Sequence, residues 1–445
     1  MALDLSPVKG TNDYLPEEQV TREWIADTLK GVFKLYGYRP IETSILDYWE
    51  VGASKYAGGE EILKETYKLT DQGKRELMLR YELTFKLAKL MGANPNMRQP
   101  FKRYEIGKVF RDGPVKMGRL REFTQCDVDV VGSKSMVLDA EIIKMVFDVF
   151  SRLGMDVYVQ VNSKKIQFGL FSACGIKEND FVPAALSLDK LVKFGKKVVV
   201  EEMEEKGIPK KSIAKLFEVL EEIESLPNEK RLQKIKVVIK DDKQGQEGIK
   251  EMEEFLAYCK QFGIAGGKDL IFQPSLARGL GYYTGMVWEV YLKDKDSKIT
   301  SSLSAGGRWD DMIGKFLGSK AEYPATGITF GLDVIYAAIK EKEGKGPSVE
   351  GIAVPKTPSV YIIPIDTLAE CLNIASQLRS NGVSCDVAFD KKLGKAMDYA
   401  NKEGIPYIIV IGGDEIKSGK VKVKDMKTGE EKSAAIDQVY KVVHK

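Results

Sequence analysis

Hydrophobic and polar residues alternate along several stretches in the first third of the chain. The stretch 101–132 alternates on both sides of a loop at 112–118 that contains glycine and proline, which predicts two antiparallel strands joined as a long hairpin. The run ELMLRYELTF, residues 76–85, alternates in the same way and predicts a further strand. Residues 136–153 carry apolar residues at helical spacing. This part of the chain is therefore expected to combine antiparallel strands with helices.

The pattern changes at two later places. A highly charged segment contains stretches such as IAKLFEVLEEIESL, which predict helices, and strand patterns return after it. The sequence GKGPSVEGIAVPKTP is typical of a linker, and beyond it strand and helix patterns alternate as in a small α/β domain. The expected divisions are a main domain formed by residues 1–166 and 259–345, a helical insertion at 167–258, a linker at 346–357 and a C-terminal domain at 358–445.

The composition excludes several classes of protein. No apolar run among the 445 residues approaches the roughly 18 residues that a membrane span needs, so we expect a cytoplasmic protein with no membrane partner. The five cysteines are scattered without CxxC spacing, which argues against a disulfide framework or a zinc site. The single histidine, His444, is next to last, which excludes Ser–His–Asp or Cys–His catalysis and a histidine-ligated metal. No metal held by the protein alone is expected.

Polar side chains lie along one face of the second predicted strand of the hairpin. The two-residue period of a strand places Gln125, Asp127 and Asp129 on one face, together with Arg121 and Phe123. Covering such a face is costly unless its polar groups contact a ligand or one another. The same period places Arg103, Glu105 and Arg111 on one face of the first strand, and Arg80, Glu82 and Thr84 on one face of 76–85. The three polar faces together indicate a binding site, and a solvent-facing sheet with ordinary cross-strand charge pairs is the alternative.

Two groups of basic residues indicate the binding of anions. The window 98–121 holds eight basic residues against two acidic ones, which fits the binding of phosphate or nucleic acid. No Walker-type or GxGxxG loop accompanies it, so a nucleotide would be held in another way. In SLARGLGYYTG, residues 275–285, Arg278 stands near three glycines that allow close backbone approach. Arg278 either binds a carboxylate or phosphate or pairs with a surface acid on an ordinary strand.

Several motifs together resemble those of histidyl-tRNA synthetases. They occur in the order found in that family, and the resemblance covers essentially the whole chain. The motifs are KGTNDYLPEE, GGEEILKETYKL, LRYELT, FKRYEIGKVFRDG, REFTQCDVDVVG, LARGLGYYTG, AGGRWDDMIG and PATGITFGLD. The resemblance implies an α/β (α+β) fold in which the main domain is the class II catalytic domain, an antiparallel sheet flanked by helices, and residues 358–445 form an anticodon-binding domain.

The resemblance also implies a function. A histidine–tRNA ligase activates L-histidine with ATP to histidyl-adenylate and transfers it to the 3′ end of tRNA(His), releasing AMP and diphosphate. ATP would enter as a complex with Mg²⁺, without a tightly bound cofactor, and the enzyme would be a homodimer.

Residue roles are carried over by the same resemblance. Arg111 and Arg278 are the expected catalytic residues, because negative charge builds where the carboxylate meets the α-phosphate. Asp129 and Tyr283 would contact the imidazole from two sides. The expected histidine-binding residues are Glu82, Leu83, Thr84, Arg111, Gln125, Asp129, Arg278, Tyr282 and Tyr283. The expected ATP-binding residues are Arg111, Arg121, Phe123 and Arg278, with Arg121 facing the distal phosphates.

Three positions depart from the family pattern. Gly281 stands where most relatives carry aspartate, and Ser44 replaces the usual motif 1 proline. Val334, after Asp333, stands where motif 3 normally supplies the arginine that stacks on adenine. This last departure leaves the adenine contact without its usual cation.

Two other functions stay open from the sequence. One is a synthetase-like regulatory subunit of ATP phosphoribosyltransferase, which binds histidine without transferring it and typically lacks the C-terminal domain. The other is a tRNA-binding or translational-control module. The retained Arg111 and Arg278, together with residues 356–445, favour the ligase.

Overall fold

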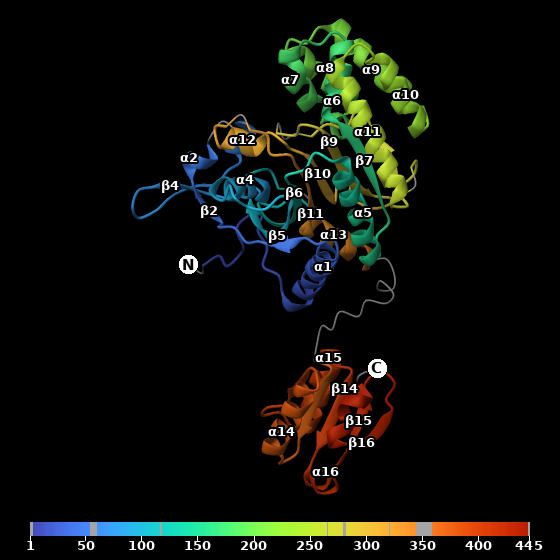
Figure 1. Cartoon of the computed structure of the whole chain (residues 1–445). Coiled ribbons are helices and arrows are strands. Elements are labelled where there is room, and N and C mark those ends of the chain that lie inside the picture. The colour runs from blue at the N-terminus through green and yellow to red at the C-terminus, as the bar shows by residue number, and fades with distance from the viewer. Residues whose placement is uncertain are drawn as a thin grey trace. The chain divides into compact units, whose positions relative to one another are not determined.

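A computed structural model describes residues 3–53, 60–115, 118–264, 266–278, 282–319, 321–343 and 358–443 (Figure 1). The chain divides into two compact units, and the described residues from 21 to 343 belong to the larger one and those from 358 to 443 to the smaller one. The expected linker at 346–357 and Gly281 lie outside the described residues.

The larger unit is built on a mixed sheet that is mainly antiparallel. Its eight described strands lie in the order β1-β5-β6-β11-β10-β9-β7-β8, and only the β1–β5 and β7–β8 pairs are parallel. The strands are β1 (Arg39–Pro40), β5 (Phe101–Phe110), β6 (Glu122–Val131), β7 (Val157–Ser163), β8 (Leu270–Phe272), β9 (Met286–Leu292), β10 (Ser304–Arg308) and β11 (Ala325–Gly331). The expected hairpin is formed by β5 and β6, which pair along their whole length.

The central strand β6 separates an apolar from a polar face of the sheet. Val128 and Val130 are buried in one apolar core with Leu29 of the first helix. Asp127 and Asp129 point to the opposite face because successive residues of a strand alternate. The helices that contribute to the core on the apolar face are α1 (Pro16–Leu35), α5 (Met136–Arg152) and α13 (Leu332–Glu343). The polar face is therefore left for a site.

The charged segment of the sequence is helical. Its apolar residues occur at helical spacing, so each helix has one apolar side. Residues on these apolar sides, such as Phe171, Leu216 and Phe255, are buried in the same continuous core as the residues of the sheet. Figure 1 shows these helices in green and yellow above the sheet. They are α6 (Lys164–Ala173), η1 (Glu178–Asp180), α7 (Phe181–Leu188), α8 (Leu191–Glu205), α9 (Lys210–Glu224), α10 (Asn228–Val238) and α11 (Lys243–Gln261).

A small three-stranded sheet in the order β2-β4-β3 completes the larger unit with four short helices. The elements are β2 (Leu46–Tyr48), β3 (Lys68–Thr70), β4 (Glu76–Leu79), α2 (Trp49–Gly52), α3 (Glu60–Lys64), α4 (Leu83–Ala93) and α12 (Met312–Phe316).

The prediction of one strand over 76–85 is wrong beyond β4. The guanidinium of Arg80 is buried, donates to the carbonyl oxygen of Lys108 at 2.7 Å and pairs with Glu105 at 3.1 Å. The chain turns at this anchored residue, and α4 begins at Leu83. A tertiary ion pair has therefore overridden the local alternation, which a single-sequence pattern does not detect.

The smaller unit has a mixed five-stranded sheet in the order β13-β12-β14-β15-β16. The first three strands are parallel and the last two antiparallel. Buried apolar residues on both sides of β12 form its core, with Ile362 on one side and Ile363 on the other. The elements are β12 (Val360–Pro364), α14 (Leu368–Ser380), β13 (Cys385–Val387), α15 (Leu393–Lys402), β14 (Tyr407–Ile411), α16 (Gly413–Ser418), β15 (Lys420–Asp425), β16 (Glu431–Ala435), η2 (Ile436–Gln438) and α17 (Val439–Val443).

Candidate active site

A cavity of about 560 Å³ lies on the polar face of the large sheet. It brings together residues that are as far apart in the sequence as Ile62 and Val334. The predicted site residues that line it are Glu82, Thr84, Arg111, Phe123, Gln125, Asp129, Arg278, Tyr282 and Tyr283. Leu83 and Arg121 are outside this lining, since Leu83 is fully buried at the start of α4 and Arg121 pairs with Asp112 at 3.3 Å.

Two residues of the cavity lining carry acceptor atoms that have no partner. Glu82 precedes the first turn of α4, and its Oε2 accepts a hydrogen bond from the hydroxyl of Tyr282 at 3.3 Å. Oε1 of Glu82 and Oε1 of Gln125 are buried without a hydrogen-bond partner. Burial raises the pKa of Glu82. Because buried acceptors are costly when unpaired, these two atoms suit a ligand group with several N–H donors, such as an ammonium.

The floor beneath these groups is an ion cluster around Arg103. The β5–β6 register places Arg103 directly opposite Asp129, and Nη2 of Arg103 lies 2.7 Å from Oδ2 of Asp129. Glu105 and Asp127 are 3.7 and 3.9 Å from the same guanidinium. Burial raises the pKa of Asp129 to about 6 and that of Asp127 to about 8, and the guanidinium opposes both shifts.

Arg103 is a residue whose part in the site the sequence analysis missed. It shares a strand face with Glu105 by its two-residue spacing, but only the pairing register shows that it supports Asp129. The side chain of Arg103 is completely buried, and among the described residues it pairs with these three carboxylates. Glu105 also pairs with Arg80 at 3.1 Å, so Arg103 is the cation that compensates Asp127 and Asp129.

Two arginines of the 98–121 window also line the cavity. Arg111 follows β5 directly, and its guanidinium carbon lies 4.2 Å from the ring centre of Tyr81 and 5.0 Å from that of Phe123. Arg119 also lines the cavity and pairs with Glu65 at 3.1 Å. The family resemblance assigns Arg121 to the distal phosphates, whereas Arg119 is the residue that lines the cavity. Arg119 and Arg121 are two residues apart, so a strand pattern predicts the same face for both and does not distinguish between them.

The Arg278 segment closes the cavity from the side of β9. Nη1 of Arg278 pairs with Oε1 of Glu289 on β9, and Nε of Arg278 is buried without a partner. The rings of Tyr282 and Tyr283 lie 4.8 Å apart, and the guanidinium carbon of Arg278 lies 5.9 Å from the ring centre of Tyr283. Glu289 is a second residue that the sequence analysis missed, because it enters only through strand pairing.

Comparison with known proteins identifies the family. The sequence model described as histidyl-tRNA synthetase matches residues 10–335, and one described as anticodon binding domain matches residues 359–445. The chain belongs to the histidyl-tRNA synthetase family. Histidine–tRNA ligase 1 of Bacillus cereus (strain ATCC 14579) is 43% identical, over 98% of this chain and 99% of that protein.

Solved structures agree with this family assignment. A histidyl-tRNA synthetase from Nostoc sp. PCC 7120 superposes with a TM-score of 0.84 at 26% identity, covering 100% of this chain and 99% of that one. An ATP phosphoribosyltransferase regulatory subunit/histidyl-tRNA synthetase from Bacillus halodurans C superposes with a TM-score of 0.73, covering 93% of this chain and all of that one. At 21% identity that likeness shows the fold alone.

The predictions of the family, the mixed α/β fold and the reaction are confirmed. The reaction of this histidyl-tRNA synthetase family member is the ATP-dependent ligation of histidine to tRNA. These comparisons favour the ligase over the regulatory subunit and the tRNA-binding module.

The two departures in this synthetase that the structure describes have defined surroundings. Asp333 accepts from the backbone N–H of Thr124 at 2.7 Å and pairs with Arg22 at 2.8 Å, so it fastens α13 to β6 and α1. Val334 lines the cavity, as does Phe123. Ser44 accepts a hydrogen bond from Nζ of Lys86 at 3.0 Å.

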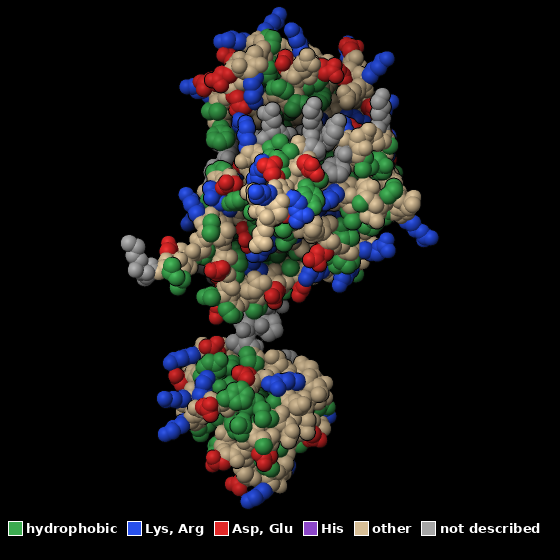
Figure 2. Space-filling view, turned by 90° about the vertical axis from the view of Figure 1, so that its left-hand side faces the viewer, with side chains coloured by type: hydrophobic (Ala, Val, Ile, Leu, Met, Phe, Trp, Pro, Cys, Tyr) green, Lys and Arg blue, Asp and Glu red, His purple; other side chains and the backbone are tan. Residues whose placement is uncertain are grey.

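The described residues of this synthetase hold no group of three or more His, Cys, Asp or Glu side chains arranged to bind a metal ion. None of its described helices combines the length and the apolar character needed to cross a membrane. On the face that Figure 2 shows, basic and acidic side chains are interspersed, in keeping with a net charge of +3.

Proposed function

We propose that the cavity on the polar face forms histidyl-adenylate from ATP and L-histidine before the histidyl group passes to the 3′ end of tRNA(His). One observation carries the proposal. The same cavity is lined by Glu82 and Gln125, which carry unpartnered buried acceptors, and by the guanidinium groups of Arg111 and Arg278. An amino acid has an ammonium and a carboxylate, and this arrangement complements both groups at once.

The reaction itself calls for fixed cations. A carboxylate oxygen of histidine attacks the α-phosphorus of ATP, an O–P bond forms, and the bond to the diphosphate oxygen breaks as diphosphate leaves. Negative charge accumulates where the two anions meet, so Arg111 and Arg278 are assigned to the carboxylate and the α-phosphate. Arg119, which lines the same cavity, is assigned to the distal phosphates. Mg²⁺ would arrive with ATP as part of the substrate.

Selection of histidine is assigned to Asp129 and Tyr283. An imidazole offers one N–H and one ring nitrogen acceptor when neutral, so a carboxylate and a phenol on its two sides complement it. Asp129 is held by Arg103 and therefore has a fixed orientation. Thr84 would join Glu82 and Gln125 around the ammonium, and Tyr282 would line the pocket while orienting Glu82.

The exchange of labelled diphosphate into ATP tests the proposal. A ligase that forms the adenylate at this cavity exchanges label only when histidine is present. A regulatory protein or a tRNA-binding module would show no exchange while still binding histidine or tRNA. Exchange that persists without histidine, or that another amino acid supports equally well, would contradict the assignment.

Asp129→Ala is expected to weaken histidine binding by roughly 1 to 3 kcal/mol, because an imidazole N–H would lose its acceptor in a buried pocket. The effect should appear as a higher KM for histidine in the exchange assay, with a much smaller change in the KM for ATP. Asp129→Asn is the matched control, since it keeps an acceptor oxygen, and it should lose less. Equal rises in both KM values for Asp129→Ala would place this residue elsewhere in the mechanism.

Val334→Arg is expected to leave the KM for ATP unchanged or to lower it by no more than about tenfold, the order of one partly buried cation–π contact. The reason is that adenine is assigned to the apolar surfaces of Phe123 and Val334, and the variant would add only the stacking cation. Measurement of the KM for ATP in the exchange assay checks this. A structure with bound ATP in which an arginine of the native chain stacks on adenine would contradict the apolar site.

The remaining assignments concern the other parts of the molecule. Residues 358–445 would select tRNA(His) through its anticodon, and the helical segment 167–258 would be an insertion in a catalytic domain of residues 1–166 and 259–345. A homodimer is supported by exposed large apolar side chains around the small sheet, at Ile45, Leu46, Tyr48 and Leu69. The cytoplasm, where tRNA is charged, is the proposed location.

A further inference from the structure

The junction between β7 and α6, residues 162–167, contacts the Arg278 segment on both sides. This junction is not part of the cavity assigned above, because none of its residues lines that cavity. It borders a separate cleft of about 440 Å³, which lies behind Tyr282 and Tyr283 and is bounded on its other side by α11 and the residues that follow β10. The two spaces share only these two tyrosines among their lining residues.

The upstream side of the segment is held by amide side chains. Nδ2 of Asn162 donates to the carbonyl oxygens of Pro274 and Leu276, at 3.0 and 2.8 Å. Nε2 of Gln167 donates to the carbonyl oxygen of Leu276 at 3.3 Å. Leu276 precedes Arg278 by two residues, and Asn162 is completely buried. The backbone entering the Arg278 turn is therefore tied to β7.

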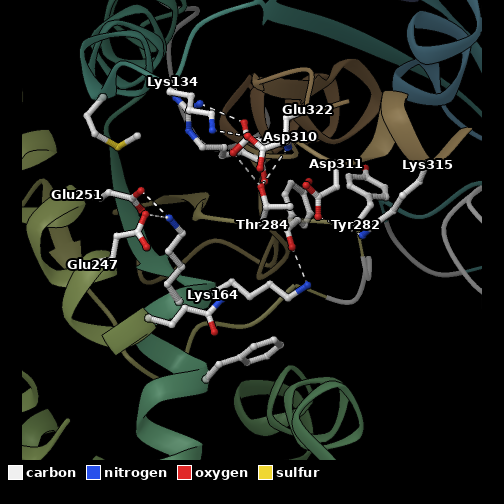
Figure 3. Close-up of a pocket in the computed structure, with 16 residues that line it drawn as sticks. Lys134, Lys164, Glu247, Glu251, Tyr282, Thr284, Asp310, Asp311, Lys315 and Glu322 are labelled. Atoms are coloured by element: carbon white, nitrogen blue, oxygen red, sulfur yellow. Dashed lines mark hydrogen bonds and ion pairs between the residues drawn. The ribbon is translucent and has the colours of Figure 1, made fainter. Parts of the chain in front are cut away.

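The downstream side is held by Lys164. The ladder between β7 and β9 ends where Ser163 pairs with Met286, and the backbone N–H of Lys164 extends it by one bond to the carbonyl oxygen of Gly285 at 2.9 Å. Nζ of Lys164 then donates to the carbonyl oxygen of Tyr283 at 2.6 Å. Figure 3 shows this side chain reaching across the cleft toward the segment that carries Tyr282 and Thr284. Where the backbone before β9 leaves the sheet, the ammonium of Lys164 therefore supplies the hydrogen bond to Tyr283 that a backbone N–H would supply within the ladder.

We propose that Asn162 and Lys164 are positioning residues for adenylate formation, which set the placement of Arg278 and Tyr283 from behind the histidine pocket. This inference rests on the roles proposed above for Arg278 and Tyr283. Neither Asn162 nor Lys164 lines the cavity to which the substrates are assigned. The bond from Lys164 acts on the backbone of Tyr283 itself, so a shift there moves the phenol that is assigned to the imidazole.

The neighbouring residue Lys165 provides a matched control. Its Nζ points away from the segment and pairs with Glu247 and Glu251 of α11, at 2.8 and 2.7 Å. Lys165→Met would remove a lysine from the same helical turn and loosen α6 from α11, but it would leave the bond to Tyr283 in place. A general loss of helix packing would therefore affect both variants alike.

The experiment compares histidine-dependent diphosphate exchange in Lys164→Met, Lys164→Arg, Lys165→Met and Arg278→Ala. Lys164→Met should lower kcat/KM for histidine by roughly 10-fold to 100-fold, the order expected when reacting groups are displaced by about 1 Å. The KM for ATP and the melting temperature should change little. Lys164→Arg should recover most of the loss because it restores a donor, and Lys165→Met should behave like the wild-type chain.

Two results would overturn the inference. If Lys164→Met keeps wild-type exchange while Arg278→Ala loses it, the junction is only structural and the assigned site stands. If Lys165→Met loses as much activity as Lys164→Met, packing of α6 explains the effect. Wild-type exchange by Arg278→Ala as well would instead show that the assignment of the site has failed.

Discussion

Replacing Arg278 with alanine is expected to lower kcat for histidyl-adenylate formation by roughly 10² to 10³, the loss that follows removal of one preorganised donor from an oxyanion site. Arg278 faces the cavity, and Glu289 and the Tyr283 ring hold its guanidinium. The planar guanidinium of Arg278 should bind the transition state, with its five-coordinate phosphorus, more tightly than it binds the separate substrates. The KM values for ATP and histidine should therefore change less than kcat in the exchange assay.

Two comparisons sharpen this expectation. Arg278→Lys should recover only part of the lost rate, because an ammonium cannot bridge two anions as a planar guanidinium does. Transfer of histidine from preformed histidyl-adenylate to tRNA should suffer less, since phosphorus then belongs only to the leaving group. Arg278 would be a structural residue if the alanine variant exchanged diphosphate at the wild-type rate.

Arg103→Leu is expected to lower the free energy of unfolding by about 3 to 5 kcal/mol, because it removes the cation that pairs with the buried Asp127 and Asp129, while Glu105 keeps its pair with Arg80. Asp129, Asp127 and Glu105 would then share a buried site without this cation. Urea denaturation at pH 8 measures the loss. Histidine binding should weaken too, because Asp129 loses the group that orients it.

The effect of Arg103→Leu should depend on pH in a defined direction. Burial already raises the pKa of Asp129 to about 6 and that of Asp127 to about 8, and loss of the guanidinium raises both further. The folded state then holds protons that the unfolded state has released, so stability falls as pH rises. The deficit should be smaller at pH 6 than at pH 8.

Arg39→Leu is the matched control for this variant. Arg39 is the register partner of Arg103 on β1, but its side chain is exposed. The same chemical change there should have little effect on stability, as surface substitutions usually do. An equal loss for both variants would show that the charge cluster is not the cause.

Local patterns were sufficient for elements whose structure depends on their own residues. The hairpin at 101–132 carries strand alternation and turn residues, and β5 and β6 form it over Phe101–Phe110 and Glu122–Val131. The helix expected at 136–153 is present as α5 (Met136–Arg152). In both cases the hydrophobic period matches the buried face of the element. The order of the family motifs likewise led to the correct family and reaction.

What the sequence by itself determined is the hairpin, the helix at 136–153, the family and most of the residues that meet at the cavity, because these depend on periodicity and on short motifs. Only the tertiary structure decided how charges pair across strands. Arg103 supports Asp129 through strand register, Glu289 holds Arg278 from β9, and Arg119 rather than Arg121 lines the cavity. The turn at Arg80 also depends on tertiary structure. The buried guanidinium of Arg80 needs a compensating acid, and its partner Glu105 comes within reach only when the chain has folded.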